Sequence, residues 1–347
     1  MDKPNVLIMT DKFAEVSREP IEMLVDAGIQ VHEHSYNTVG SISDEKFCEL
    51  IQGMDVLVVT GSFPVSDRVI ESADCLKMIA IRSSGFDGTD LDAAGENGIV
   101  VTHNPGANAD SVADTTIGLM LAVLKKIAKL DRMIRHGGWE RERTLDMHGK
   151  LLGIIGLGRI GKRVVKRAQG FDMKIIANDI IEYKDFSDIN GIEMVSKGEL
   201  MRRADVITIH TPLDDTTRGM IDERRLRLMK DSVVVINTAR GAIVDENALY
   251  KALSRGWIGG AGLDVHVTEP PGLRALVELE NVVSTCHIAG LSDDASYAMS
   301  MQTVEKIIAC LSGRIPPDVL TPRVTLPIKA VLPVPEWPKF LLTVRIG

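Results

Sequence analysis

The sequence of 347 residues predicts an α/β protein that contains two doubly wound parallel sheets. Short runs rich in branched apolar residues alternate with helix-compatible runs, first over residues 5–103 and again from residue 151 onwards. This alternation is typical of βαβ units. A glycine-rich turn that opens a helix occurs in the second region and not after the first strand of the chain. The two regions are therefore expected to form two different α/β domains.

The first region contains five predicted strands and no phosphate-binding glycine motif. These strands are predicted at Asn5–Thr10, Gln30–Ser35, Asp55–Thr60, Lys77–Arg82 and Ile99–His103. The helices between them are predicted at Glu19–Ala27, Asp44–Gln52, Asp67–Ala73 and Leu91–Glu96. Five such strands, without a phosphate-binding turn, predict a flavodoxin-like domain.

Asn104-Pro105-Gly106 interrupts the alternation and predicts a hinge or a crossing between domains. A long helix is expected to follow, from about Asp110 to Arg135, because apolar residues recur along it until Gly137-Gly138. Much of its circumference is apolar, which is more than one core-facing stripe requires. The helix is therefore expected to be buried between domains or to lie in a subunit interface.

The second region opens with an apolar run that ends in Gly156-x-Gly158-x-x-Gly161, and a helix-compatible run follows at once. Gly156 permits a tight turn, Gly158 lets the backbone approach a pyrophosphate, and Gly161 lets the helix pack close to the strand. The helix N-terminus adds N–H groups and a positive dipole end. Such a motif alone also fits a turn before a surface helix, but the strand–turn–helix context favours a dinucleotide site.

Asp179 supports the same interpretation because it ends the next apolar run, 18 residues after Gly161. A ribose-binding carboxylate is expected at that place. Beside a 2′-phosphate at ~4 Å, an aspartate costs on the order of 4 kcal/mol per unit charge at an effective dielectric constant of ~20. The sequence therefore favours NAD over NADP, although the nearby Lys184 leaves the absolute preference open.

Polar residues follow successive strands of the second region, and ligands of open α/β sheets bind at that edge. The strands are predicted at Leu151–Ile155, Lys174–Asn178, Ile192–Val195, Asp205–His210, Ser232–Thr238, Gly260–Val265 and Val282–Thr285, and a last helix at about Asp293–Leu311. Among the polar residues, Arg240, Glu269 and His287 form a chemically coherent set. Arginine binds a carboxylate through two N–H groups, histidine exchanges a proton near neutral pH, and a carboxylate fixes the histidine tautomer. The set suits hydride reduction of a 2-oxo acid, although each residue alone also fits a structural role.

Composition excludes several classes of protein. The net charge of −8 gives no general attraction to nucleic acid or to acidic lipid. No apolar run approaches the ~20 residues of a membrane span, and the first residues predict no signal peptide. Four cysteines without a CxxC pair predict free thiols in a cytoplasmic location, and neither they nor the histidines predict a metal site.

Six stretches together resemble the D-isomer-specific 2-hydroxyacid dehydrogenases, in particular their phosphoglycerate dehydrogenase-like branch. They are Gly156-Leu-Gly-Arg-Ile-Gly161, His210-Thr-Pro212, Asn237-Thr-Ala-Arg-Gly241, Gly262-Leu-Asp-Val265, Glu269-Pro270 and His287-Ile-Ala-Gly290. The resemblance covers roughly residues 77–320 and implies a flavodoxin-like substrate domain with an inserted Rossmann domain that binds NAD. The implied bounds are 1–103 and 290–322 for the substrate domain, 104–289 for the NAD-binding domain and 323–347 for a C-terminal tail.

The resemblance also implies roles for single residues. His287 looks like the acid–base residue, Glu269 like its carboxylate partner and Arg240 like the substrate-binding arginine. Besides the three glycines, the implied cofactor-binding residues are Arg159, Ile160, Asp179, His210, Thr211, Pro212, Thr238, Ala239, Arg240, Asp264, His287, Ala289 and Gly290. The implied substrate-binding residues are Ser83, Ser84, Gly85, Asn104, Arg240 and His287. Three residues depart from the family pattern: Ser83 for glycine, Thr268 for an acid and Cys286 for proline.

The expected function is interconversion of a small 2-oxo acid and a D-2-hydroxy acid with NAD(H), of the phosphoglycerate dehydrogenase or the hydroxypyruvate/glyoxylate reductase type. The resemblance implies a homodimer through the helix near Asp110–Arg135, with domain closure about Asn104–Gly106 and Gly290–Leu291. No lysine and arginine cluster lies near the substrate residues, which weakens the case for a phosphorylated substrate. Two alternatives remain open. One is an NAD(H)-sensing, corepressor-like interaction protein that uses the proline-dotted tail, and the other is a dehydrogenase of formate or phosphite.

Overall fold

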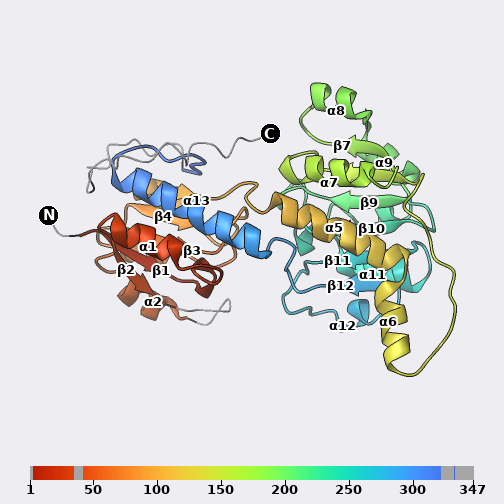
Figure 1. Cartoon of the computed structure of the whole chain (residues 1–347), viewed down its shortest axis with the longest axis horizontal. Coiled ribbons are helices and arrows are strands. Elements are labelled where there is room, and N and C mark those ends of the chain that lie inside the picture. Colours follow the sequence, from red (N-terminus) through yellow and green to blue (C-terminus); the bar gives the residue numbers. More distant parts are fainter. Residues whose placement is uncertain (1–2, 35–41, 322–331, 333–347) are drawn as a thin grey trace. The chain divides into compact units, whose positions relative to one another are not determined.

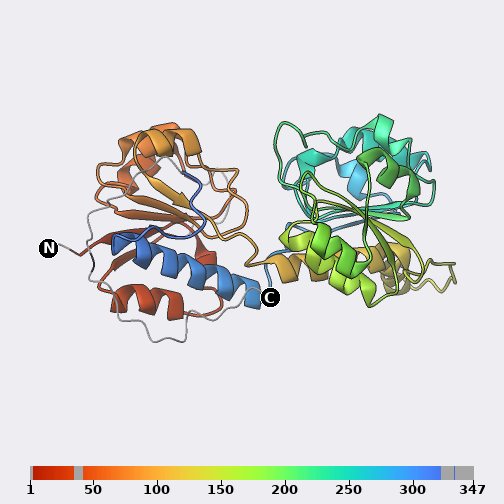
Figure 2. The same ribbon diagram turned by 90° about the horizontal axis from the view of Figure 1, so that it is seen from above.

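The computed structural model describes residues 3–34, 42–321 and 332. The chain folds into two compact units. Unit 1 comprises Met1–Asn108 and Asp293–Gly347, and unit 2 comprises Ala109–Ser292. Each unit contains one parallel sheet with helices on both faces (Figures 1 and 2), which confirms the predicted fold class. The predicted C-terminal tail, residues 323–347, lies outside the described residues apart from Leu332.

Unit 1 contains a five-stranded sheet in the order β2-β1-β3-β4-β5, which is the flavodoxin-like order. The strands are β1 (Asn5–Ile8), β2 (Gln30–Glu33), β3 (Val56–Val59), β4 (Met78–Ile81) and β5 (Val100–Thr102). Every residue of β3 and β4 is buried. Burial on both faces explains why these strands appear in the sequence as continuous apolar runs.

Helices cover both faces of this sheet. α1 (Glu19–Asp26) and α13 (Asp293–Leu311) pack on one face, while α2 (Asp44–Leu50), α3 (Asp67–Ser72) and α4 (Leu91–Glu96) pack on the other; a short 3₁₀ helix, η1, spans Asp11–Phe13. Side-chain caps fix where several of them begin: the Ser43 hydroxyl accepts the Lys46 N–H, and the Asp90 carboxylate accepts the Ala93 N–H. α13 has the bounds that its sequence predicts.

Unit 2 contains a seven-stranded sheet in the order β12-β11-β10-β9-β6-β7-β8. The strands are β6 (Leu151–Ile155), β7 (Lys174–Asn178), β8 (Glu193–Met194), β9 (Val206–Ile209), β10 (Val234–Asn237), β11 (Gly260–Leu263) and β12 (Val282–Ser284). The chain enters at β6, proceeds outward to β8, and then returns to β9 on the opposite side of β6. This reversal between β6 and β9 is the topological switch point at which doubly wound sheets bind nucleotides.

Two layers of helices cover the sheet of unit 2 (Figure 2). α5 (Ala109–Leu124) and α7 (Arg159–Gln169) pack on one face, and α9 (Lys197–Arg203), α10 (Glu223–Leu226), α11 (Glu246–Ser254) and α12 (Arg274–Val277) on the other; α6 (Ile127–Arg135), α8 (Lys184–Asn190) and the 3₁₀ helix η2 (Gly241–Ile243) complete the unit. Within the part of the chain that the structure describes, no helix is long and apolar enough to cross a membrane.

The single long helix predicted from about Asp110 to Arg135 is wrong, because the structure contains α5 and α6 with a break between them. Lys126 adopts the left-handed conformation at φ +54°. The segment after α6 returns to the end of α5, where the Leu145 N–H donates to the carbonyl oxygen of Leu124 at 3.0 Å. Lys126 also forms an ion pair with Glu142 at 2.8 Å. These contacts, distant in sequence, end the helix where its apolar pattern continues.

Candidate active site

The turn after β6 contains three glycines that serve different steric needs. Gly156 has φ +95°, and a Cβ there would lie 2.6 Å from the carbonyl oxygen of His210. A Cβ on Gly161 would lie 2.2 Å from the carbonyl oxygen of Gly156, whereas a Cβ on Gly158 would meet no atom within 4 Å. The fold therefore requires Gly156 and Gly161. The space beside Gly158 is open, as the approach of a pyrophosphate requires.

Asp179 follows β7 and braces this turn. Its Oδ2 accepts the Leu157 N–H at 2.6 Å, and its Oδ1 accepts the Ile181 N–H at 2.9 Å. A carboxylate accepts about four hydrogen bonds, so both oxygens keep capacity for ribose hydroxyls. Ile180, between Asp179 and Ile181, is fully exposed and adds an apolar surface at the same edge of the sheet. The sequence analysis did not include Ile180 among the cofactor-binding candidates, although it directly follows Asp179.

His210, Thr211 and Pro212 follow β9, next to the glycine turn. His210 Nε2 lies 3.0 Å from the Thr208 hydroxyl, and burial lowers the pKa of His210 to about 3, so the ring is neutral at working pH. Among the described residues, the buried His210 Nδ1 and Thr211 hydroxyl have no hydrogen-bond partner. Buried polar atoms are nearly always paired. Two such atoms at the switch point fit the binding of a polar ligand there.

Arg240 lies in a tight turn after β10. Asn237 closes this turn, because its Nδ2 donates to the carbonyl oxygen of Arg240 at 2.9 Å and its Oδ1 accepts the Ala239 N–H at 3.0 Å. Arg240 Nη1 donates to the carbonyl oxygen of Ala239 at 2.8 Å. The Thr238 hydroxyl lies 3.0 Å from the Thr116 hydroxyl of α5. The turn is therefore stabilised by its own hydrogen bonds and by a contact with α5.

The structure brings Glu269 and His287 into contact. His287 Nδ1 lies 2.8 Å from Glu269 Oε2, and the two side chains are 43% and 41% exposed. An ionised carboxylate only accepts hydrogen bonds, so Nδ1 is the donor and Nε2 is left to exchange a proton. Burial raises the pKa of Glu269, but the hydrogen bond and the charge of His287, with smaller effects of His266, bring it below its ordinary value. The carboxylate is therefore ionised at neutral pH.

Asp264 fixes the turn on which His287 stands. His287 has φ +56°, in the left-handed region that few side chains adopt. The Asp264 carbonyl oxygen accepts the His287 N–H at 2.8 Å. The Asp264 carboxylate is buried, and it accepts the Thr285 hydroxyl and the N–H groups of Ile288 and Ala289, both at 2.9 Å. These bonds give Asp264 a positioning role, and its expected contact with the cofactor stays a prediction.

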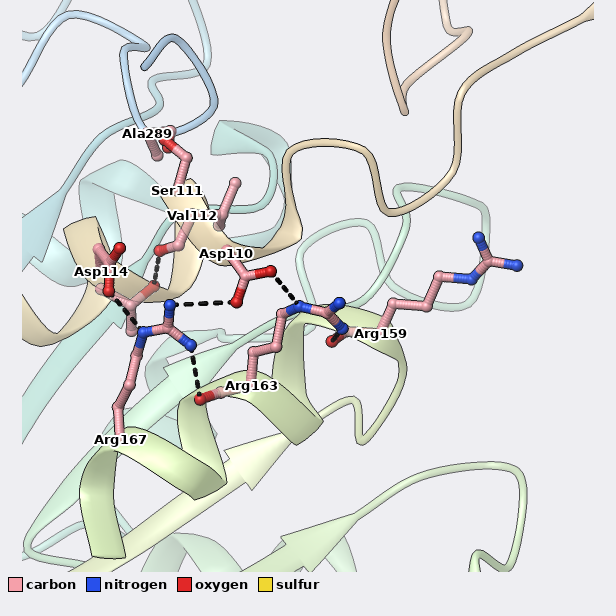
Figure 3. Close-up of polar contacts among 9 residues, drawn as sticks. Asp110, Ser111, Val112, Asp114, Arg159, Arg163, Arg167 and Ala289 are labelled. Carbon is pink, nitrogen blue, oxygen red and sulfur yellow. Dashed lines mark hydrogen bonds and ion pairs between the residues drawn. The ribbon is translucent and has the colours of Figure 1, made fainter. Parts of the chain in front are cut away.

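A ladder of ion pairs joins α5 to α7 (Figure 3). Arg163 Nε donates to Asp110 Oδ2 at 2.7 Å, and Arg167 bonds both Asp110, at 3.1 Å, and Asp114. Burial raises the pKa of Asp110, but its bonds with Arg163 and Arg167 lower it more, to below the ordinary value. The ladder fixes α7, whose N-terminus faces the open space at Gly158. Its signal in the sequence is two pairs spaced four apart, Asp110 with Asp114 and Arg163 with Arg167.

The first turn of α5 also contacts the turn that carries His287, because the Ser111 hydroxyl donates to the carbonyl oxygen of Ala289 at 2.7 Å. Figure 3 shows that the Arg159 side chain extends away from the ion-pair ladder, and it is exposed. The other predicted cofactor residues lie as follows: Ile160 packs on the core under α7, the carbonyl oxygen of Pro212 accepts the Thr217 hydroxyl, and Gly290 is half-buried. The first turn of α5 thus links α7 to the turn of His287.

The predicted substrate loop of unit 1 follows β4. The Ser83 hydroxyl donates to the carbonyl oxygen of Gly85 at 2.9 Å, and the Ser84 hydroxyl bonds the carbonyl oxygen of Asn104 and the side chain of Asn108. Within the described part of the chain, the backbone N–H groups of Ser84 and Gly85 have no acceptor. Two such N–H groups at the end of a strand suit an anion.

Asn104 lies in the interior of unit 1 and is 1% exposed. Its Nδ2 donates to the carbonyl oxygen of Met299 at 2.9 Å and to the Thr303 hydroxyl at 2.7 Å, while its Oδ1 accepts from Lys306 at 3.0 Å. Both N–H bonds of the amide are therefore used within unit 1. These bonds anchor α13, and the contact with substrate predicted for Asn104 stays a prediction.

Comparison with known proteins agrees with this geometry. Residues 117–289 match the model of the NAD-binding domain of D-isomer-specific 2-hydroxyacid dehydrogenases. The chain is 38% identical to a glyoxylate reductase of Korarchaeum cryptofilum over 289 residues, which are 81% of this chain and 87% of the relative. It is also 38% identical to a D-3-phosphoglycerate dehydrogenase of Methanocaldococcus jannaschii over 317 residues, which are 90% of this chain but only 59% of that protein.

A solved structure of D-lactate dehydrogenase from Aquifex aeolicus, in complex with NAD and lactic acid, is also similar. It is 29% identical, the match covers 91% of this chain and 99% of that one, and the TM-score is 0.79. The open space at Gly158 and the carboxylate of Asp179 fit NAD, and the matched domain confirms the expected cofactor. The chain belongs to the D-isomer-specific 2-hydroxyacid dehydrogenase family, whose members are NAD-dependent oxidoreductases acting on CH–OH groups.

Proposed function

We propose that this family member reduces a small, unphosphorylated 2-oxo acid, such as hydroxypyruvate or glyoxylate, to the D-2-hydroxy acid. The observation that carries the proposal is the 2.8 Å contact of Glu269 with His287 on a turn fixed by Asp264. NADH, when bound, supplies the hydride. Protonated His287 donates from Nε2 to the carbonyl oxygen of the substrate, and ionised Glu269 stabilises the imidazolium.

Arg240 binds the substrate carboxylate in this proposal, because a guanidinium forms two parallel hydrogen bonds with a carboxylate. The guanidinium takes no part in proton transfer. It fixes the orientation of the carbonyl group relative to His287.

The charge distribution of unit 1 favours an unphosphorylated substrate. Residues 83–110 contain no lysine or arginine, although they include the predicted substrate loop. The preceding Arg82 is buried, and its guanidinium donates to the Ser300 hydroxyl at 2.8 Å and to the carbonyl oxygen of Ser296 at 2.9 Å. Its polar bonds are thus made to α13. The phosphate of a phosphorylated substrate would need a lysine or an arginine as its partner, and residues 83–110 supply none.

A panel of 2-oxo acids with NADH tests the proposal. Glyoxylate, hydroxypyruvate, pyruvate and phosphohydroxypyruvate are compared by kcat/KM, with NADPH as the alternative reductant. We expect glyoxylate or hydroxypyruvate to be the best substrate and NADH the better reductant. Phosphohydroxypyruvate as the best substrate would make the enzyme a phosphoglycerate dehydrogenase, and failure to reduce any of the four would contradict the reaction class.

Replacement of Glu269 by glutamine is expected to shift the pH dependence of reduction. Reduction needs protonated His287, and the ionised carboxylate of Glu269 stabilises that imidazolium at neutral pH. Its loss should move the alkaline limb of kcat/KM to lower pH. A pH profile from 5 to 10 measures this, and an unmoved limb would contradict the assigned role of Glu269.

A matched pair of alanine variants separates cofactor binding from folding. Gly158→Ala is expected to leave the melting temperature unchanged, because its Cβ meets no protein atom, but to weaken NADH binding at least tenfold. Gly161→Ala is expected to lower the melting temperature, because its Cβ would lie 2.2 Å from a carbonyl oxygen. Thermal unfolding and NADH fluorescence titration measure both effects. Equal NADH affinity of Gly158→Ala and wild type would rule out cofactor binding at this turn.

We also propose a homodimer whose interface includes α6. This helix has no buried residue, and Ile127, Ile134 and the following Trp139 are exposed. Ile134→Glu is expected to give a monomer by light scattering, whereas Ile189→Glu on α8, at an isoleucine that is even more exposed, should not change the mass. A wild-type monomer would contradict the proposal.

The predicted cytoplasmic location rests on four free cysteines and stays a prediction.

A further inference from the structure

A second carboxylate–imidazole pair lies behind the proposed catalytic one. His266 Nδ1 lies 3.5 Å from Glu246 Oε1, and the two side chains are only 3% and 13% exposed. Glu246 is the first residue of α11, and His266 lies between β11 and Glu269. The mechanism above uses neither residue. Both are far less exposed than His287 and Glu269, so they belong to the interior of unit 2.

This buried pair is bonded to the segment that carries Glu269. The His266 N–H donates to Glu269 Oε1 at 3.2 Å, while Glu269 Oε2 accepts from His287. The Val267 N–H donates to Glu246 Oε1 at 2.9 Å. One carboxylate oxygen of Glu246 thus contacts both the ring of His266 and the backbone that follows it. Each carboxylate oxygen of Glu269 therefore accepts one hydrogen bond, Oε1 from the His266 N–H and Oε2 from His287.

The same segment also contacts the turn of Arg240. A Cβ added to Gly241 would lie 2.0 Å from the carbonyl carbon of His266, so the two backbones are in direct contact. α11 follows that turn and presents Glu246 at its first position. The Arg240 turn, the first turn of α11 and the segment leading to Glu269 therefore form one packed assembly, with the pair of Glu246 and His266 inside it.

We propose that Glu246 and His266 are positioning residues that hold Glu269 in contact with His287. A half-exposed glutamate has several rotamers and loses its alignment readily. A buried brace behind it fixes the backbone N–H that binds Oε1 and leaves Oε2 for His287. His266 also helps to lower the pKa of Glu269. The inference rests on the proposed acid–base role of Glu269 and His287, and it assigns their alignment to two residues that touch neither substrate nor cofactor.

Glu246→Ala removes the hydrogen bond from the Val267 N–H and the 3.5 Å contact with His266, and it tests the proposal in the whole chain. Compared with wild type, Glu246→Ala should lower kcat for hydroxypyruvate about tenfold, with unchanged NADH affinity. The alkaline limb of kcat/KM should also move to lower pH, because Glu269 then stabilises protonated His287 less well. Glu246→Gln keeps an acceptor for the Val267 N–H and should restore most of the lost kcat. His266→Phe retains the backbone N–H but loses the ring, and should show the same pH shift in a weaker form.

The matched control is Glu223→Ala, because Glu223 is likewise the first residue of a helix whose cap is an aspartate, Asp222, but lies on α10. Values of kcat and pH profile for Glu246→Ala and His266→Phe that equal those of this control would overturn the inference. If Glu246→Ala does not fold, His266→Phe decides alone. Glu269→Gln and His287→Asn are measured in parallel. Full activity of those two would instead refute the proposed function, so the two failures are distinguishable.

Discussion

Replacement of His287 by asparagine is expected to lower kcat for 2-oxo acid reduction by about 10²–10⁴-fold, because the variant has no acid to protonate the carbonyl oxygen. Asparagine is the better choice than glutamine here, since His287 has φ +56° and asparagine tolerates that region. Stopped-flow and steady-state NADH oxidation measure the loss. NADH affinity should stay within about threefold of wild type.

The neighbouring Cys286 offers a matched control for this variant. It is exposed, lies on the same turn and has no part in the proposed chemistry. Cys286→Ala should therefore retain wild-type kcat. Near wild-type turnover of His287→Asn would remove His287 from the mechanism, and an equal loss in both variants would indicate that the turn, rather than the imidazole, had been damaged.

Replacement of Arg240 by lysine is expected to lower kcat/KM for the 2-oxo acid by about 10²-fold, chiefly through a higher KM. Lysine keeps the charge but forms no parallel pair of hydrogen bonds, and one charge-assisted bond contributes roughly 1.5–3 kcal/mol. Arg224→Lys, at an exposed position on α10, is the control and should match wild type. Substrate saturation curves at fixed NADH measure the split between KM and kcat. An unchanged KM would show that Arg240 does not bind the carboxylate.

Much of the fold follows from local patterns. β3 and β4 are buried on both faces, so their apolar runs mark them without ambiguity. The Gly156–Gly161 motif is equally local, because backbone crowding at Gly156 and Gly161 excludes a side chain there. The pairing of Glu269 with His287 could be proposed because both follow strands whose carboxyl ends share one edge of the sheet.

The remainder depends on contacts that no local pattern contains. The break between α5 and α6 is set by Leu145 and Glu142, which return to the helix from beyond it. The carboxylate of Asp264 is bonded to the backbone of residues 288 and 289, and the amide of Asn104 to α13. The sequence does not distinguish a polar residue after a strand that binds a ligand from one that forms hydrogen bonds within the protein. The ligand contacts expected of these two residues therefore rest on the resemblance to the family and stay predictions.

The configuration of the hydroxy acid that is formed is the sharpest test of the proposed reaction. Hydroxypyruvate is incubated with NADH and the full-length protein, and the glycerate formed is resolved by chiral chromatography against both enantiomers. We expect D-glycerate, formed in equal amount to the NADH oxidised, and a rate of formation lower by at least about 10²-fold with His287→Asn. L-glycerate, a racemic product or NADH oxidation without glycerate would contradict it.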